Sequence, residues 1–143
     1  MHVLQAVDVM NIPKGYPRLP FPVLSVKPFS AWAIVHGHKD VENRSRRTNH
    51  RGLLVIHASS YRSRAECDAD YWSVRDRLPA SVHVPMEVPD SGLVGTVEVV
   101  GCTDDSTSKW AADGAKHWLL KNGKPLQPHA CKGWLGVWTM REE

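Results

Sequence analysis

The sequence predicts an α+β fold: a small mixed β-barrel of five or six strands with two main helices inserted between them. Short runs of apolar and β-branched residues recur along the chain, as expected of strands. Two segments with apolar residues at helical spacing, 28–36 and 63–78, interrupt these runs. The length of 143 residues and the hydrophobic content of 42% suit one domain with its own core.

The first 22 residues are expected to form a proline-rich arm, followed by a single domain at 23–143. Four prolines lie in this arm, and proline fixes φ and lacks an N–H, which disfavours a helix or a central strand. Residues 23–26 then predict the first strand. Pro28 suits the first turn of the following helix, and Gly37 is expected to end it.

The later elements follow from the same signals. Strands are expected, in chain order, at residues 40–44, 53–58, 93–100, 116–121 and 134–140. The charged segment 63–78 predicts the second helix, which Pro79 ends, and the proline-containing segment 81–92 is expected to be a loop. Asn122-Gly123 predicts a turn directly after the strand at 116–121.

A charged stretch from Gly37 to Gly52 lies between two apolar segments. If residues 40–44 form a strand, Asp40, Glu42 and Arg44 share one face of it. Charges beside a core are costly unless they pair with one another or meet a polar ligand. This stretch is therefore the first candidate for a functional site.

The charge is unevenly distributed along the chain. The net charge of +3 combines ten basic and three acidic residues in the first 64 positions with eight basic and twelve acidic residues in the rest. The clustered arginines are Arg44, Arg46, Arg47, Arg51, Arg62 and Arg64. A basic surface of this kind attracts phosphate or nucleic acid, although an ordinary solvated face explains the same charges.

Neither a metal nor a cofactor is predicted. The three cysteines are widely spaced, which indicates neither a disulfide framework nor a cysteine zinc site. His36 and His38 supply two neighbouring ligands, but zinc needs three or four, and nothing in the sequence fixes a third. No apolar run approaches the roughly 20 residues of a membrane helix, and no secretory signal is recognised. The expected location is the reducing cytoplasm, without a membrane partner.

Six segments carry a resemblance to a known family. The most specific is a Gly-x-Lys-x-x-Glu-x-Arg element, formed by Gly37, Lys39, Glu42 and Arg44 directly after the first predicted helix. The others are Leu24-Ser25-Val26-Lys27-Pro28-Phe29 with Trp32, Arg51-Gly52, Ile56-His57-Ala58-Ser59, Gly95-Thr96-Val97-Glu98 and Lys132-Gly133-Trp134-Leu135-Gly136-Val137-Trp138. Over roughly residues 23–140 the chain resembles the ASCH (activating-signal-cointegrator homology) domain of the PUA-like superfamily.

The resemblance implies a small pseudo-barrel with a cleft between the first helix and the barrel, and it implies binding of RNA or other nucleic acid. Some members are hydrolases that act on acetylated cytidine or as ribonucleases. In the amidohydrolase members a threonine nucleophile follows the lysine by three residues. Glu42 occupies that position here, and a carboxylate cannot form an acyl ester by the same chemistry.

The side chains of the charged stretch suggest specific roles. Lys39 could bind a phosphate or carbonyl oxygen, or act as a base. Glu42 could accept hydrogen bonds from the exocyclic amine of a nucleobase or form a structural ion pair. The planar guanidinium group of Arg44 could form two hydrogen bonds to a phosphate, or it could be the ion-pair partner of Glu42. The further ligand-binding residues predicted are Ser25, Lys27, Trp32 as core or stacking surface, Arg46, Arg47, Arg51 and His57.

Three functions remain open. The favoured one is a nucleic-acid-binding module that holds single-stranded RNA or a modified nucleoside in a basic cleft. The second is a hydrolase, either a nucleoside amidohydrolase or a ribonuclease, with Lys39 and Glu42 as catalytic residues. The third is a protein-interaction domain whose basic face is incidental. The sequence leaves open whether the protein is an enzyme.

Overall fold

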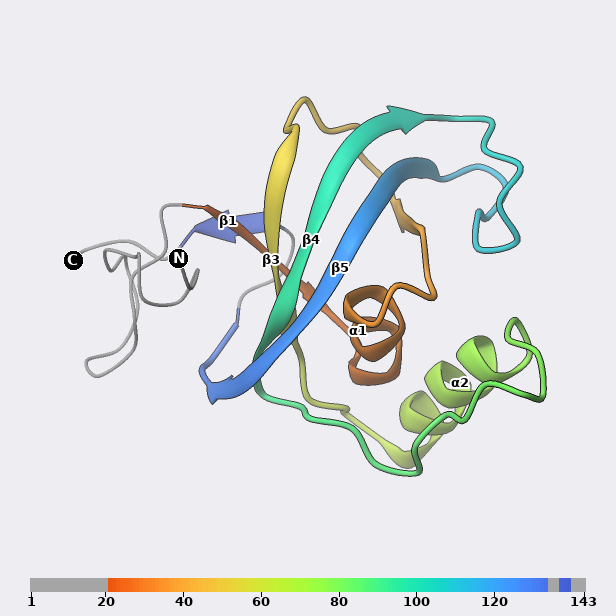
Figure 1. Cartoon of the computed structure of the whole chain (residues 1–143), viewed down its shortest axis with the longest axis vertical. Helices are drawn as coiled ribbons and strands as arrows, with labels where there is room; N and C mark the ends of the chain where they lie inside the picture. Colours follow the sequence, from red (N-terminus) through yellow and green to blue (C-terminus); the bar gives the residue numbers. More distant parts are fainter. Residues whose placement is uncertain (1–20, 134–136, 140–143) are drawn as a thin grey trace.

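The computed structural model describes residues 21–133 and 137–139, and these form a curved mixed sheet with two helices beside it (Figure 1). The elements are β1 (Pro22–Val26), α1 (Pro28–Val35), β2 (Val41–Arg44), β3 (Gly52–Ala58), α2 (Arg64–Arg75), β4 (Gly92–Thr103), β5 (Lys116–Ala130) and β6 (Val137–Thr139). Six strands in one mixed sheet and two main helices in the described part of the chain confirm the predicted α+β fold.

The strands follow the order β2-β5-β4-β3-β1-β6 across the sheet. β1 and β3 are parallel, and the other neighbouring pairs are antiparallel. Parallel neighbours need a crossover connection, which α1 and β2 supply between β1 and β3. Within this parallel pair Ser25 lies opposite His57, so two residues 32 positions apart in the sequence are neighbours in the sheet.

α1 lies between the sheet and α2 (Figure 1), and this position explains why it is apolar on more than one side. Ala31 and Ile34 belong to the core cluster on the sheet side, whereas Phe29 and Ala33 pack in a second cluster with Val74 of α2. A helix buried on two faces needs apolar residues on both. Its composition therefore follows from its place in the middle layer.

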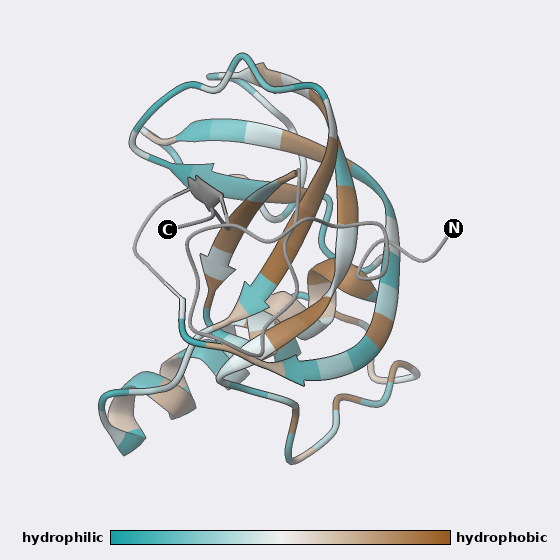
Figure 2. Cartoon of the chain, turned by 90° about the vertical axis from the view of Figure 1, so that its left-hand side faces the viewer, coloured by the Kyte–Doolittle hydropathy of each residue, from teal (hydrophilic) through white to brown (hydrophobic). Residues whose placement is uncertain are grey.

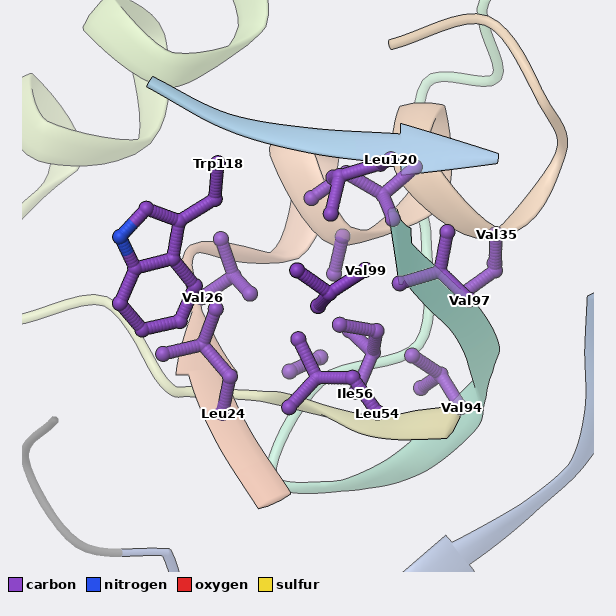
Figure 3. Packing of buried hydrophobic residues seen from close by; sticks show 13 residues of the cluster. Leu24, Val26, Val35, Leu54, Ile56, Val94, Val97, Val99, Trp118 and Leu120 are labelled. Atoms are coloured by element: carbon purple, nitrogen blue, oxygen red, sulfur yellow. The ribbon is translucent and has the colours of Figure 1, made fainter. Parts of the chain in front are cut away.

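The sheet-side core gathers apolar side chains from four strands and α1, mostly Val, Leu, Ile and Ala together with Trp118 of β5. Figure 3 shows Leu24 of β1, Ile56 of β3, Val97 of β4 and Leu120 of β5 pointing toward one another. The loops and strand ends are mostly hydrophilic, while the middle stretches of the strands are apolar (Figure 2). This core holds β1, β3 and α1 in fixed relative positions, which matters for the site.

Both ends of α1 and the start of α2 agree with the sequence signals. Gly37 has a φ of +81°, and the N–H of the next residue, His38, donates to the Ala33 carbonyl at 2.8 Å, closing α1. α2 begins at Arg64, with the Ser63 side chain accepting from the Glu66 N–H at 3.1 Å. The predicted helix at 63–78 is thus confirmed with a slightly earlier end, at Arg75.

The predicted turn at Asn122-Gly123 is wrong. β5 runs through both residues from Lys116 to Ala130, and the register between β4 and β5 shifts at this point. A Cβ on Gly123 would collide with the Ile34 carbonyl oxygen. Asn122 has a φ of +57°. The pair therefore forms an irregularity where β5 passes directly against α1, and the close approach requires the glycine.

Two predictions fall mainly outside the described residues. Of the proposed arm at 1–22 the structure describes Phe21 and Pro22, and Pro22 already begins β1. Of the closing strand at 134–140 it describes Val137–Thr139, which pair antiparallel with β1. No helix in the described part of the chain is long and apolar enough to cross a membrane.

Candidate functional site

A cleft of about 460 Å³ opens where β1 ends and α1 begins, beside β2 and the segment that leads into α2. Its charged lining residues are Lys27, Lys39, Arg44, Arg62, Glu42 and Glu66. Its hydroxyl groups come from Ser25, Ser30, Ser59 and Ser60. The cleft volume lies within the range of about 300–1,000 Å³ that is usual for small-molecule sites.

Glu42 is the buried centre of the charged lining. Its carboxylate contacts Lys39 Nζ at 3.4 Å through Oε1 and an Arg44 guanidinium nitrogen at 3.6 Å through Oε2. The Glu42 side chain is 8% exposed, against 11% for Lys39 and 26% for Arg44. Glu42 and Arg44 share a face of β2 because they are two residues apart, and Lys39 reaches them from the segment before the strand.

Asp40 does not join this group, contrary to the alternation predicted from the sequence. β2 begins at Val41, and the Asp40 carboxylate instead accepts a hydrogen bond from Ser108 Oγ at 2.5 Å. Since Asp40 precedes the strand, period-two alternation does not apply to it. The cleft is therefore less acidic than the sequence pattern indicated.

Two tryptophans lie beside the cationic residues of the cleft. Lys39 Nζ lies 5.9 Å from the ring centroid of Trp110, and Arg44 Cζ lies 6.0 Å from that of Trp118. These distances suit cation–π contacts. Both tryptophans are only 5% exposed, so they pack in the core and position the cations, and neither offers a free face to a nucleobase.

Ser25 and His57 form a hydrogen-bonded pair at the end of β1. Ser25 Oγ lies 3.1 Å from His57 Nδ1, and His57 Nε2 lies 2.6 Å from the Cys131 carbonyl oxygen. Ser25 lines the cleft, whereas His57 is buried behind it. Burial lowers the pKa of His57 below its usual range, and the hydrogen bond to Cys131 opposes that shift.

The structure separates the remaining predicted residues from the cleft. Trp32 lines a different, largely apolar groove of about 320 Å³, together with prolines that include Pro28 and Pro125. Arg46, Arg47 and Arg51 lie in the exposed connection between β2 and β3.

Two of these arginines have partners there. One guanidinium nitrogen of Arg47 contacts Asp104 at 3.2 Å. Arg51 donates to the Thr48 and His50 carbonyls at 3.0 and 2.8 Å. These contacts lie away from Glu42, so the predicted set divides into a cleft, an apolar groove and an exposed loop.

The neighbouring histidines pack against Trp32. The His36 and His38 rings lie 5.2 and 5.1 Å from the Trp32 ring, centroid to centroid. Burial, His36 and Lys109 together lower the pKa of His38. In residues 21–133 and 137–139 no group of three or more His, Cys, Asp or Glu side chains is arranged to hold a metal ion.

Several cleft residues were not singled out from the sequence. These are Ser30 of α1, Asn43 of β2, Ser60 and Glu66. Glu66 accepts hydrogen bonds from the Arg62 guanidinium at 2.8 and 3.1 Å, and these bonds lower the pKa of its carboxyl. The Ser63-to-Glu66 spacing signals a helix start, but only the packing of α2 against α1 brings that start to the cleft.

Comparisons with known proteins identify the family of the chain and agree with its fold. The family model described as the ASCH domain matches residues 24–136. Among solved structures, the chain is similar to a mutant of ZmASCH from Zymomonas mobilis, with 16% sequence identity and a TM-score of 0.51. The alignment covers 85% of this chain and 90% of that one, and at this identity it shows the fold alone. None of the curated proteins matches the sequence.

Proposed function

The chain belongs to the ASCH domain family, and from that premise we propose that it is a nucleic-acid-binding module. Its ligand is single-stranded RNA or a modified nucleoside, held in the cleft around Lys39, Glu42 and Arg44. The observation that carries this proposal is the excess of positive charge in a cleft of ligand size. Four cationic side chains and two carboxylates line it.

The cations suit the phosphate groups of such a ligand. Lys39 and Arg44 share the single carboxylate of Glu42 at 3.4 and 3.6 Å, distances at which neither ion pair is tight. A phosphate in the cleft would give both cations a second anionic partner. The arginine fork can bind it with two hydrogen bonds, while the lysine acts as a point charge.

The polar lining suits the rest of a nucleotide. The Ser59 and Ser60 hydroxyls can donate to or accept from ribose hydroxyls or phosphate oxygens. Glu42 is an acceptor and fits an exocyclic amine of a base. Because Trp110 and Trp118 are buried, we do not assign base stacking to either of them.

A comparison of two lysines tests the proposal. Lys39 and Lys109 both lie 5.9 Å from the Trp110 ring, but only Lys39 is among the cleft-lining residues. Lys39→Ala is expected to weaken binding of a short single-stranded RNA about tenfold, and to reduce the slope of log affinity against log salt by about 0.7. Lys109→Ala is expected to change affinity less than about twofold. Fluorescence anisotropy over a salt series measures both.

Equal effects of the two substitutions would contradict the proposal, because they would assign the charge effect to the surface as a whole. Binding without salt dependence would favour the protein-interaction alternative. RNA or nucleoside turnover that disappears in Lys39→Ala while binding persists would favour the hydrolase alternative with Lys39 and Glu42 as catalytic residues.

A further inference from the structure

Two buried histidines, His57 and His117, have matching surroundings on one side of the ring. Each is 3% exposed. His57 Nε2 lies 2.6 Å from the Cys131 carbonyl oxygen, and His117 Nε2 lies 2.7 Å from the Ala112 carbonyl oxygen. A carbonyl only accepts, so Nε2 carries the proton in both rings. In the neutral form Nδ1 is then the acceptor.

The other side of the two rings differs. His117 Nδ1 accepts from the backbone N–H of Ser106 at 3.1 Å, and a peptide N–H does not give up its proton. His57 Nδ1 accepts from the Ser25 hydroxyl at 3.1 Å, and Ser25 lines the cleft. His117 is thus a structural linker, whereas His57 holds a hydroxyl group in the arrangement of a base with its nucleophile.

The backbone holds this pair firmly. Ser25 and His57 are opposite one another in the parallel β1–β3 ladder, which sets their side chains on the same face. Gly133 closes the arrangement, since a Cβ there would lie 2.6 Å from Ser25 Oγ and closer still to the His57 ring. A side chain at position 133 would collide with the pair, so the glycine permits the close packing.

We propose that Ser25 is a nucleophile and His57 its general base, and that the cleft hydrolyses a carboxylic ester carried by a phosphate-bearing ligand. The anionic part of this ligand rests on the proposed function of Lys39 and Arg44. An ester suits the site better than an amide, because a backbone carbonyl rather than a carboxylate orients His57. The imidazolium is then less stabilised, and an alcohol leaves more readily than an amine.

The reaction proceeds in two steps, acylation of Ser25 and hydrolysis of the acyl ester. Ser25 Oγ bonds to the ester carbonyl carbon while its proton passes to His57 Nδ1. The bond from that carbon to the alcohol oxygen then breaks, and the departing oxygen takes the proton from Nδ1, leaving an acyl ester on Ser25. Water next gives a proton to Nδ1 and attacks the acyl carbon. The bond to Ser25 Oγ breaks, the proton returns to Oγ, and a carboxylic acid is released.

An alkyl fluorophosphonate tests the nucleophile directly, because it loses fluoride as Ser25 Oγ bonds to its phosphorus. Intact mass and peptide mapping are expected to show one label, on Ser25, in the wild-type chain. Ser25→Ala is expected to abolish labelling, while Ser73→Ala, an exposed serine of α2, leaves it unchanged. Ser25→Ala should also remove the steady hydrolysis of 4-nitrophenyl acetate above background.

The pH dependence tests the base without any substitution. The labelling rate should rise with pH and level off, with a midpoint below 6.5, because burial lowers the pKa of His57 from that value and the neutral ring is the base. His57→Gln should lower the rate at least about a hundredfold, within the usual contribution of general base catalysis. If circular dichroism shows that this variant does not fold, the pH profile of the wild type alone tests whether His57 is the base.

Labelling of other serines in place of Ser25, or a labelling rate whose midpoint lies above 6.5, would overturn the inference. RNA binding is a separate measurement. It is made on the unlabelled wild-type chain with a short single-stranded RNA over a salt series. Absence of salt-dependent RNA binding refutes the binding proposal, and failure to label Ser25 refutes the catalytic one.

Discussion

Glu42 and Asp70 are both buried carboxylates, yet their surroundings differ. Asp70 of α2 accepts from Ser30 Oγ at 2.6 Å, from the Tyr61 hydroxyl at 2.5 Å and from the Phe29 N–H at 2.9 Å. Glu42 contacts two cations at 3.4 and 3.6 Å in an open cleft. Burial alone therefore does not distinguish a structural carboxylate from one that we propose to meet a ligand, whereas the type and distance of the partners separate the two.

Asp70 acts as a cap for α1 from another helix. The N-cap residue of α1, Lys27, makes no side-chain capping bond, and the carboxylate of Asp70 takes over the first N–H groups and complements the positive end of the helix. Tyr61 stays protonated as a donor, because burial and the hydrogen bond to Asp70 raise its pKa. This cluster fixes α1 against α2, and with it one wall of the cleft.

The largest effect on stability is expected from Asp70→Ala. The substitution removes the nearer acceptor of the buried Phe29 N–H, which keeps only the Tyr61 hydroxyl oxygen at 3.2 Å, and it removes the acceptor of the Ser30 and Tyr61 hydroxyls. It should lower the free energy of unfolding by about 3 kcal/mol. Asp68→Ala is the matched control on the same helix, since the exposed Asp68 pairs with an exposed Arg64 at 3.2 Å. Its effect should stay within about 0.5 kcal/mol. Urea denaturation followed by circular dichroism measures both.

A smaller effect on stability, with a gain in binding, is expected from Glu42→Gln. Lys39 and Arg44 lose a charged partner, but the cleft is open and water can reach them, so the free energy of unfolding should fall by only about 1 kcal/mol. The affinity for inorganic phosphate should rise about fivefold, because one negative charge leaves the cleft. Calorimetric titration measures the affinity. Glu87→Gln, at an exposed position outside the cleft, controls for net charge.

Weaker phosphate binding by Glu42→Gln would reverse this assignment. It would mean that the carboxylate organises Lys39 and Arg44 for the anion rather than competing with it. A loss of stability as large as that of Asp70→Ala would place Glu42 with Asp70 among the structural carboxylates. Only the second result would remove the contrast between the two acids.

Local signals in the sequence were sufficient to predict the positions of most helices and strands. Pro28 and Gly37 mark the ends of α1 because their effects act within one turn, and the apolar runs locate β3 and β4. The same local reasoning failed at Asn122-Gly123, where the glycine is required by a contact with Ile34, which lies far away in the sequence. A dipeptide signal cannot reveal such a contact.

The candidate site shows the same limit. The motif spacing brought Lys39, Glu42 and Arg44 together correctly, because all three lie in or next to one short strand. It could not show that Trp32 faces another groove, or that Glu66 reaches the cleft from α2. The Ser25–His57 pair depends on the parallel β1–β3 register, which no local pattern specifies. The functional roles of all these residues stay predictions.

The exposed arginines between β2 and β3 can be compared with the buried carboxylates Glu42 and Asp70. Of these groups, the exposed arginines are expected to contribute least to the free energy of unfolding. Replacing Arg46, Arg47 and Arg51 together with Ala should change the free energy of unfolding by less than about 1 kcal/mol, since exposed pairs such as Arg47 with Asp104 contribute little. RNA binding should weaken, and the salt slope should flatten by about 0.7 for each phosphate group that an arginine no longer neutralises. Because Asp104 already neutralises Arg47, that arginine should account for the least of the change. A salt slope equal to that of the wild type would leave the three residues as solubilising charges and confine phosphate binding to the cleft.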